Sequence, residues 1–247
     1  MAVRSVESSP QLYARGGGAL YLALILSGVA GMAIRSSLIV SGDAAATAAR
    51  LMSKEPLWRL AIGFEFAAIV CATALAMVYF VLLGPVSREL NLLATFLRLV
   101  AISVQAVAAL DFVAALLPLR NPDSARAFTP DQLYALMTLA IRSHAYGVGL
   151  ALFFFGCCFL FHGRLIFRSG FLPPVLGILI QVAGVCYLTL GLAQFVAPDF
   201  ARRVSPFILL PPFVGEASLC LWLLLKGVDV QKWQERASAA RVSAAPG

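Results

Sequence analysis

Residues 58–83 read WRLAIGFEFAAIVCATALAMVYFVLL, a run that is apolar over almost its whole length. A helix needs about 20 residues to cross the hydrocarbon core of a bilayer, so this stretch predicts a membrane-spanning helix. Glu65 lies inside the run. An ionisable group in hydrocarbon is costly and by default marks a functional site. The stretch therefore predicts a transmembrane helix that carries a polar position.

The same pattern recurs along the chain and predicts an all-α integral membrane bundle of six transmembrane helices, arranged as three helical hairpins. The predicted spans are residues 17–34, 58–83, 90–117, 130–161, 172–195 and 206–226. A cleaved signal peptide is the alternative for the first, but that run exceeds the usual 7–15-residue signal core. We expect a polar N-terminal tail over 1–16, a six-helix domain over 17–227 and a polar C-terminal tail over 228–247.

Two helix-start signals support the predicted helices. Asp43 can cap the start of a short helix over residues 44–52 in the longest outer loop. Thr129, Pro130 and Gln132 form a capping box in front of the fourth span. Because the fourth helix is longer than one bilayer thickness, its first turns are expected to stand above the membrane.

Composition places the chain in the same class. It has 247 residues, of which 61% are hydrophobic and 13% charged, with a mean hydropathy of +0.89. Soluble domains carry about 25% charged residues. The net charge of +7 comes mostly from Lys and Arg at the span ends, where they contact lipid headgroups. No basic stripe with interleaved aromatics is present, so the lipid bilayer is the expected partner and nucleic acid is not.

The sequence gives no sign of a catalytic or metal centre. All five cysteines fall inside apolar runs without a CxxC pair, and they are expected to be small buried hydrophobes. His162, four residues after Cys158, is read as an interface residue at the cytoplasmic end. We expect neither disulfides nor metal nor cofactor. The absence of a readable catalytic motif leans against an enzyme without deciding the question.

One polar centre is predicted near the membrane midplane. Glu216 follows Pro211 and Pro212, which cannot donate backbone hydrogen bonds and should kink the helix. Such a break is tolerated only where the helix is buried in protein or lines a polar cavity. Gln181 should lie level with Glu216 and could hydrogen-bond to it. Arg98 either extends to the headgroups or faces Glu216.

A second polar layer is predicted nearer the outer surface, formed by Glu65, Asp111, Arg142 and His144. Asp111 and Arg142 are equidistant from the centre of the loop that joins their spans, so they should lie level and form an ion pair. His144 has two open readings, a hydrogen-bonded packing residue or a proton relay. Gly147 has no side chain, so we expect space for the His144 ring beside it.

One sequence pattern occurs in two loops, and the basic residues give a weak indication of the orientation in the membrane. Residues 122–130 and 198–206 share the pattern P-D-x-A-R-x-x-[ST]-P, which fits either duplicated hairpins or two loops with the same helix cap. Nine basic residues lie on the side of the termini and eight on the other. The short loop 162–171 holds Arg164 and Arg168 and favours cytoplasmic termini.

Several stretches together resemble a bacterial multi-spanning family defined only as domain of unknown function 4386. They include Pro10-Gln-Leu-Tyr-Ala-Arg15-Gly, Phe96-Leu-Arg98-Leu, His144-Ala-Tyr-Gly147, Phe167-Arg-Ser-Gly170-Phe-Leu-Pro and Gly215-Glu216-Ala-Ser-Leu. The resemblance runs from about residue 10 to 227. It implies a multi-pass protein of the bacterial inner membrane and supplies no catalytic residues.

Three functions are compatible with these residues. The first is a transporter-like protein for a small molecule, ion or proton, centred on Glu216, Gln181 and Arg98. The second is a non-catalytic membrane interaction or sensor subunit whose buried charges only fix helix packing. The third, an intramembrane enzyme acting on lipid, lacks any readable nucleophile–base pair. Oligomeric state and substrate are not encoded in a readable form.

Overall fold

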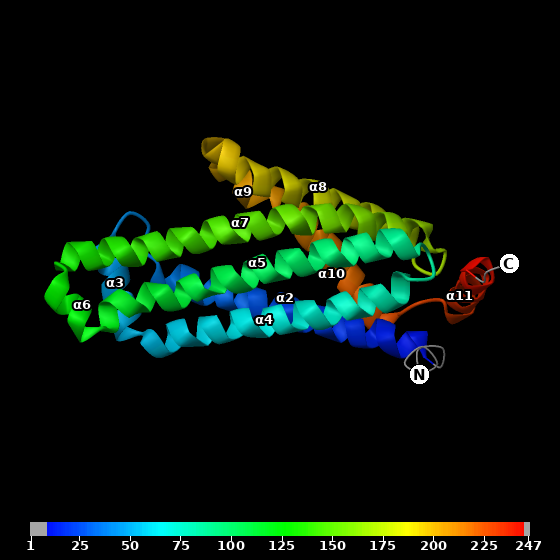
Figure 1. Cartoon of the computed structure of the whole chain (residues 1–247), viewed down its shortest axis with the longest axis horizontal. Coiled ribbons are helices and arrows are strands. Elements are labelled where there is room, and N and C mark those ends of the chain that lie inside the picture. The colour runs from blue at the N-terminus through cyan, green and yellow to red at the C-terminus, as the bar shows by residue number, and fades with distance from the viewer. Residues whose placement is uncertain (1–8, 245–247) are drawn as a thin grey trace. The chain divides into compact units, whose positions relative to one another are not determined.

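The computed structural model describes residues 9–244 and is all-α (Figure 1). The described residues form ten helices. Their bounds are α2 Pro10–Leu38, α3 Ala44–Ser53, α4 Glu55–Leu83, α5 Arg88–Arg120, α6 Pro122–Ala127, α7 Pro130–Ser169, α8 Pro174–Val196, α9 Pro198–Ile208, α10 Leu210–Leu225 and α11 Val230–Ala244.

Five of these helices are long and apolar enough to cross a membrane, namely α2, α4, α5, α7 and α8. Helices α9 and α10 together provide a sixth candidate span if they are counted as one bent element. The all-α class and the multi-span character are therefore confirmed. The pairing of the spans into three hairpins stays a prediction.

Both predicted capping signals are confirmed. The side chain of Asp43 accepts a hydrogen bond from Ala46 N at 2.8 Å at the start of α3. At the start of α7, Gln132 Oε1 accepts from Thr129 N at 2.9 Å, and Thr129 Oγ1 accepts from Gln132 N at 3.4 Å. Each pair satisfies backbone N–H groups that have no partner within the first turn of a helix.

Helix α2 is longer at both ends than the predicted span 17–34. It begins at Pro10, where Ser9 Oγ accepts from Leu12 N at 3.2 Å, and it continues to Leu38. The hydropathy pattern marks only the part of a helix that is apolar, whereas hydrogen bonding carries the helix on through polar residues. Arg35 therefore lies within the helix and does not end it.

The span predicted over 206–226 is interrupted near its start, as its prolines indicate, but the interruption lies at Leu209, before Pro211 and Pro212. The chain breaks at Leu209, and α9 and α10 are bent by 55° relative to each other. Pro211 and Pro212 occupy the first turn of α10, where a missing N–H leaves no intrahelical bond unmade. The prolines thus define the beginning of a new helix, with Glu216 about one turn further along.

The two loop segments with the repeated sequence pattern each form a helix that begins at the first proline of the pattern. Residues Pro122–Ala127 form α6 and residues Pro198–Ile208 form α9. Helix α9 is strongly amphipathic, with Ala201 buried and Phe200 and Phe207 exposed. The repeated sequence therefore encodes a helix start in both places.

The described chain divides into two compact units. Unit 1 is formed by residues up to Ala23, by Cys71–Ile102 and by the chain from Gly149 onward. Unit 2 is formed by Leu24–Val70 and Ser103–Val148. Helices α2, α4, α5 and α7 each supply one segment to each unit, and the two units are described separately below.

In unit 1, glycines bring the backbones of α7 and α8 into close contact. Gly149, Gly156 and Gly163 on α7 face Gly191, Gly184 and Gly177 on α8, each set spaced by seven residues. A Cβ placed on Gly156 would lie 2.6 Å from Leu188 N and 2.8 Å from Gly184 O. Small residues at this spacing allow transmembrane helices to approach closely.

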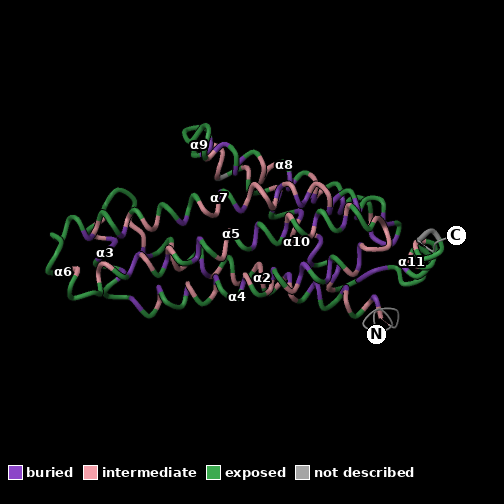
Figure 2. Tube along the Cα trace, in the orientation of Figure 1, coloured by how far each residue is buried: buried purple, intermediate pink, exposed green. Residues whose placement is uncertain are grey.

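Further contacts in unit 1 join segments that are distant in sequence. Gln11 Nε2 donates to Lys226 O at 2.8 Å, and Gln11 Oε1 accepts from Val228 N at 3.0 Å. Trp233 Nε1 donates to Leu82 O at 3.0 Å. These bonds tie the beginning of α2, the end of α4 and the chain after α10 to one another. Apart from Trp233, helix α11 is mostly exposed (Figure 2).

Unit 2 has its own apolar core around an aromatic pair. Trp58 and Phe112 pack edge to face with ring centroids 5.4 Å apart, and Trp58 Nε1 donates to Phe112 O at 3.0 Å. Leu38, Leu51 and Met137 are fully buried against this pair. The core thus combines α2, α3, α4, α5 and α7.

Candidate functional site

The carboxyl group of Glu216 lies at the centre of a polar cluster in unit 1. Tyr21 Oη on α2 donates to Glu216 Oε2 at 2.9 Å, and Tyr187 Oη on α8 donates to Oε1. Helix α2 reaches this position because Gly18 lies against the backbone of Leu224, with Cys220 Sγ 3.5 Å from Gly18 O. The missing side chain at Gly18 therefore places Tyr21 beside Glu216.

Arg98 on α5 is the cation of the same cluster, and only 2% of it is exposed. Its guanidinium carbon lies 5.0 Å from the ring centroid of Tyr79 and 5.9 Å from that of Phe155. Arg98 and Glu216 interact electrostatically. Nevertheless, the ion pairs found among residues 9–244 include neither of them. The two opposite charges thus share a buried cluster without direct contact.

His162 is buried in this cluster, which corrects its reading as an interface residue. Only 2% of it is exposed, and its ring packs on Tyr79 with centroids 4.9 Å apart. Its Nδ1 lies 3.1 Å from Cys158 Sγ. The reading was wrong because α7 continues beyond residue 161 to Ser169, so His162 lies two turns inside the helix. Cys158 is buried, as expected, but it also makes this polar contact.

A narrow pocket lies between these side chains. It is lined by Tyr21, Tyr79, Arg98, Phe159, His162, Ile166, Ile180 and Leu219. The space between these side chains is too narrow to hold a water molecule. Within the described residues, two nitrogens of Arg98 (Nε and Nη1) and His162 Nε2 have no hydrogen-bond partner. The pocket therefore combines a cation and unused polar groups with aromatic walls.

Gln181 is not a partner of Glu216, contrary to the prediction from loop symmetry. Its Nε2 donates to Gly177 O at 3.4 Å. A Cβ on Gly163 would lie 2.6 Å from Gln181 Cγ, so the side chain packs toward α7. The close approach of α7 and α8 explains this orientation. Tyr187 takes the place expected for Gln181.

In unit 2, Glu65 is fully paired. Its Oε2 lies 3.1 Å from Arg35 Nη1, and its Oε1 accepts from Gln105 Nε2 at 2.9 Å. The guanidinium of Arg35 also lies 4.7 Å from the ring centroid of Phe112. Glu65 was predicted to belong to a polar layer, but its cation was missed because Arg35 had been assigned to the end of the first span.

His144 acts as a hydrogen-bonded packing residue in unit 2. Its Nδ1 lies 3.0 Å from Ala108 O, and its ring packs on Phe112 with centroids 3.7 Å apart. A Cβ on Gly147 would lie 2.5 Å from Ala108 Cβ. Gly147 therefore permits the contact between α7 and α5 that His144 uses.

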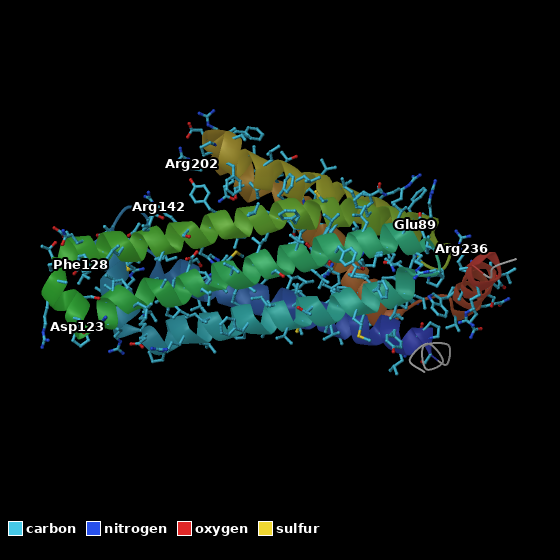
Figure 3. The ribbon with its side chains drawn as sticks, viewed as in Figure 1. Glu89, Asp123, Phe128, Arg142, Arg202 and Arg236 are labelled. Carbon is cyan, nitrogen blue, oxygen red and sulfur yellow. The ribbon has the colours of Figure 1, made fainter. Side chains whose placement is uncertain are left out.

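The predicted ion pair between Asp111 and Arg142 is wrong. No ion pair between described residues joins them. Arg142 is exposed on α7 (Figure 3), where it lines a surface hollow with Asp131 and Tyr134. Asp111 is partly buried and interacts electrostatically with His144. Loop symmetry predicts height but not the face of the helix, and here the faces differ.

The sequence reasoning missed the three tyrosines, Tyr21, Tyr79 and Tyr187. It counted only charged residues within the apolar runs, whereas a tyrosine away from the membrane interface also needs a hydrogen-bond partner. A search for such tyrosines would have found all three. Within residues 9–244, no group of three or more His, Cys, Asp or Glu is arranged to hold a metal ion.

The helix lengths and hydropathy define a multi-pass membrane protein. Residues 17–227 match the family described as "Domain of unknown function (DUF4386)", and the chain belongs to this family. It is also similar to an "Uncharacterized protein" of Archaeoglobus fulgidus, with 25% identity over 177 residues, which cover 72% of this chain and 89% of the relative. No solved structure matches the chain significantly.

Proposed function

We propose that this protein is a transporter-like membrane protein for a small molecule, ion or proton, with its polar centre at Glu216 and Arg98. Gln181, which we predicted for that centre, packs against α7 and does not bond to Glu216. The observation that carries the proposal is that a buried carboxyl group and a buried guanidinium share one cluster without forming an ion pair. Charges that serve packing alone are usually neutralised by direct pairing.

Unit 2 provides the contrast. Glu65 is held by Arg35 and Gln105 through both of its oxygens, which is the arrangement expected of a structural charge. Glu216 is held by two phenols that can also pass a proton along a chain of hydrogen bonds. We therefore assign a packing role to Glu65, Asp111 and His144, place the exposed Arg142 outside both roles, and assign transport to the cluster of unit 1.

The alternative function is a membrane interaction or sensor subunit without transport. One observation favours it: Tyr21 and Tyr187 together supply a hydrogen bond to each oxygen of Glu216. A neutral carboxylic acid held in this way would be a packing element. The experiment below separates the two functions.

The finer topology is part of the proposal. We place a single six-helix domain at residues 17–227, built of three hairpins, in a bacterial cytoplasmic membrane with both termini in the cytoplasm. The bonds that join Gln11 to the chain at Lys226 and Val228 support termini on one side. Arg164 and Arg168 near the end of α7 support the cytoplasmic side.

Proton flux through reconstituted protein tests the function. Proteoliposomes with internal pyranine are given an inside-negative potential by potassium and valinomycin, and internal acidification is followed. The wild type should acidify the lumen, whereas Glu216→Gln should not, because the amide cannot exchange a proton. Asp111→Asn is the matched control, since it makes the same change in a span outside the cluster and should retain the flux.

Thermal unfolding in detergent completes this test. Transport requires that Glu216→Gln unfolds near the wild-type temperature while its flux is lost. If the wild type carries no flux and Glu216→Gln unfolds at a much lower temperature, the packing function is correct. Equal flux in the wild type and Glu216→Gln would also overturn the proposed role of Glu216.

A further inference from the structure

We propose that the pocket beside Glu216 binds a small monovalent anion, a halide or a short carboxylate, between Arg98 and His162. This inference rests on the site of the proposed function and names the class of its ligand. It is drawn from the unused hydrogen-bond donors of the pocket and from the charge of the side chains around it.

The first observation is the state of Arg98. Its side chain is buried, yet Nε and Nη1 have no hydrogen-bond partner among the described residues. Guanidinium nitrogens are donors only, and leaving a charged donor unsatisfied in a low dielectric is costly. The ring of Tyr79 offsets part of this cost through its negatively polarised face. An anion that accepts a hydrogen bond from one of these nitrogens would lower this cost.

The second observation is that His162 lines the same pocket. Cys158 Sγ lies 3.1 Å from His162 Nδ1, and a thiol that donates to Nδ1 leaves the ring proton on Nε2. Nε2 is the nitrogen without a partner within residues 9–244. In that tautomer the imidazole donates to the same anion as Arg98, and we assign Cys158 as the positioning residue that selects it.

The walls of the pocket define the size and charge of the ligand. Tyr79, Phe159, Ile180 and Leu219 enclose the polar groups. The crevices between them are too narrow for a water molecule, so a ligand requires a small rotation of these side chains and must itself be small. Arg98 supplies one full positive charge, which matches one negative charge. A cation is excluded because the unused groups are donors.

Glu216 should regulate this site. It interacts electrostatically with Arg98 without contacting it as an ion pair. A charged carboxylate competes with the anion for the guanidinium, whereas a neutral carboxylic acid leaves Arg98 without an opposite charge. Anion binding and proton uptake by Glu216 should therefore favour each other.

Thermal unfolding of the full chain in detergent tests the site. Tryptophan fluorescence is recorded in sodium gluconate and in increasing sodium chloride or sodium formate at constant ionic strength. Either small anion should raise the unfolding temperature of the wild type in a saturable way, because a ligand that binds only the folded state stabilises it. Arg98→Gln should abolish the rise. Arg142→Gln, an exposed arginine outside the site, should retain it.

Two further variants make the test independent of folding and of transport. His162→Phe keeps a ring against Tyr79, removes Nε2 and should reduce the saturable rise severalfold, even if Arg98→Gln does not fold. Glu216→Gln should keep or increase the rise. The proposal is overturned if neither anion stabilises the wild type, or if the rise persists in His162→Phe. A rise that persists without proton flux would overturn the transport function alone.

Discussion

Two glutamates in membrane spans have different kinds of partner. Glu65 has a cation and an amide within hydrogen-bond distance. Glu216 has two phenols and no cation in direct contact. The sequence predicted both as polar positions within helices, because charge and hydropathy are local properties. It could not predict their partners, since those depend on which helix faces meet.

Removing one member of the pair between Arg35 and Glu65 should destabilise the protein strongly. Glu65→Leu leaves a partly buried guanidinium without a counter-charge, and because the pair is not fully buried we expect a loss of about 2–3 kcal/mol, below the range of a fully buried pair. The double variant Arg35→Met with Glu65→Leu should recover most of this loss, because both desolvation penalties disappear. Thermal unfolding in detergent measures the effect. A double variant less stable than either single variant would contradict the structural role.

The Tyr187 hydroxyl should contribute to the environment of the Glu216 carboxyl group and not only to packing. Tyr187→Phe removes one donor and keeps the ring on Phe159, where the centroids are 5.6 Å apart. We expect a loss of about 1–3 kcal/mol in stability. The infrared band of the Glu216 carboxyl or carboxylate group should also shift in Tyr187→Phe, and this band should be absent in Glu216→Gln. Phe159→Leu, which alters packing alone, should leave the band in place.

At the scale of elements, the contact between α7 and α8 is built from two heptad series of glycine. The hydropathy of both helices predicted membrane spans, and the capping box predicted where α7 begins. The glycine spacing was present in the sequence and would have predicted the close approach. Gln181 was misplaced because that approach directs its side chain toward α7.

Alanine at Gly156 should therefore weaken the packing of α7 on α8. The added Cβ would lie 2.6 Å from the backbone nitrogen of Leu188, which requires the helices to separate, and overpacking of this kind costs about 1–3 kcal/mol. Gly63→Ala in α4 is the matched control, because a Cβ there has no neighbour within 4 Å among the described residues. Because alanine has a higher helix propensity than glycine, Gly63→Ala should be neutral or slightly stabilising. Equal unfolding temperatures for both variants would argue against the glycine contact.

At the scale of the whole molecule, hydropathy predicted the class and most spans, because each apolar run is a local signal. The break at Leu209 was only partly predictable. Pro211 and Pro212 indicated a disturbance, but whether a proline kinks a helix or begins a new one depends on the residues packed around it. For the same reason, helix length and hydropathy identify five spans directly, and the sixth candidate span consists of α9 and α10 together.

Reporter fusions test whether α10 completes a sixth crossing. Gln11 is bonded to the chain after α10, Trp233 to the end of α4, and Asp229 N to Phe171 O at 3.1 Å. These contacts bring the start of α2 and the ends of α4, α7 and α10 together in unit 1, which an even number of crossings would explain. In bacterial cells, alkaline phosphatase fused at the C-terminus or inserted at residues 84–87 should be inactive. The same enzyme inserted at residues 40–43 should be active. If the enzyme were active at the C-terminus and inactive at residues 84–87, these two positions would lie on opposite sides of the membrane. The chain would then make an odd number of crossings, and α10 would not be one of them.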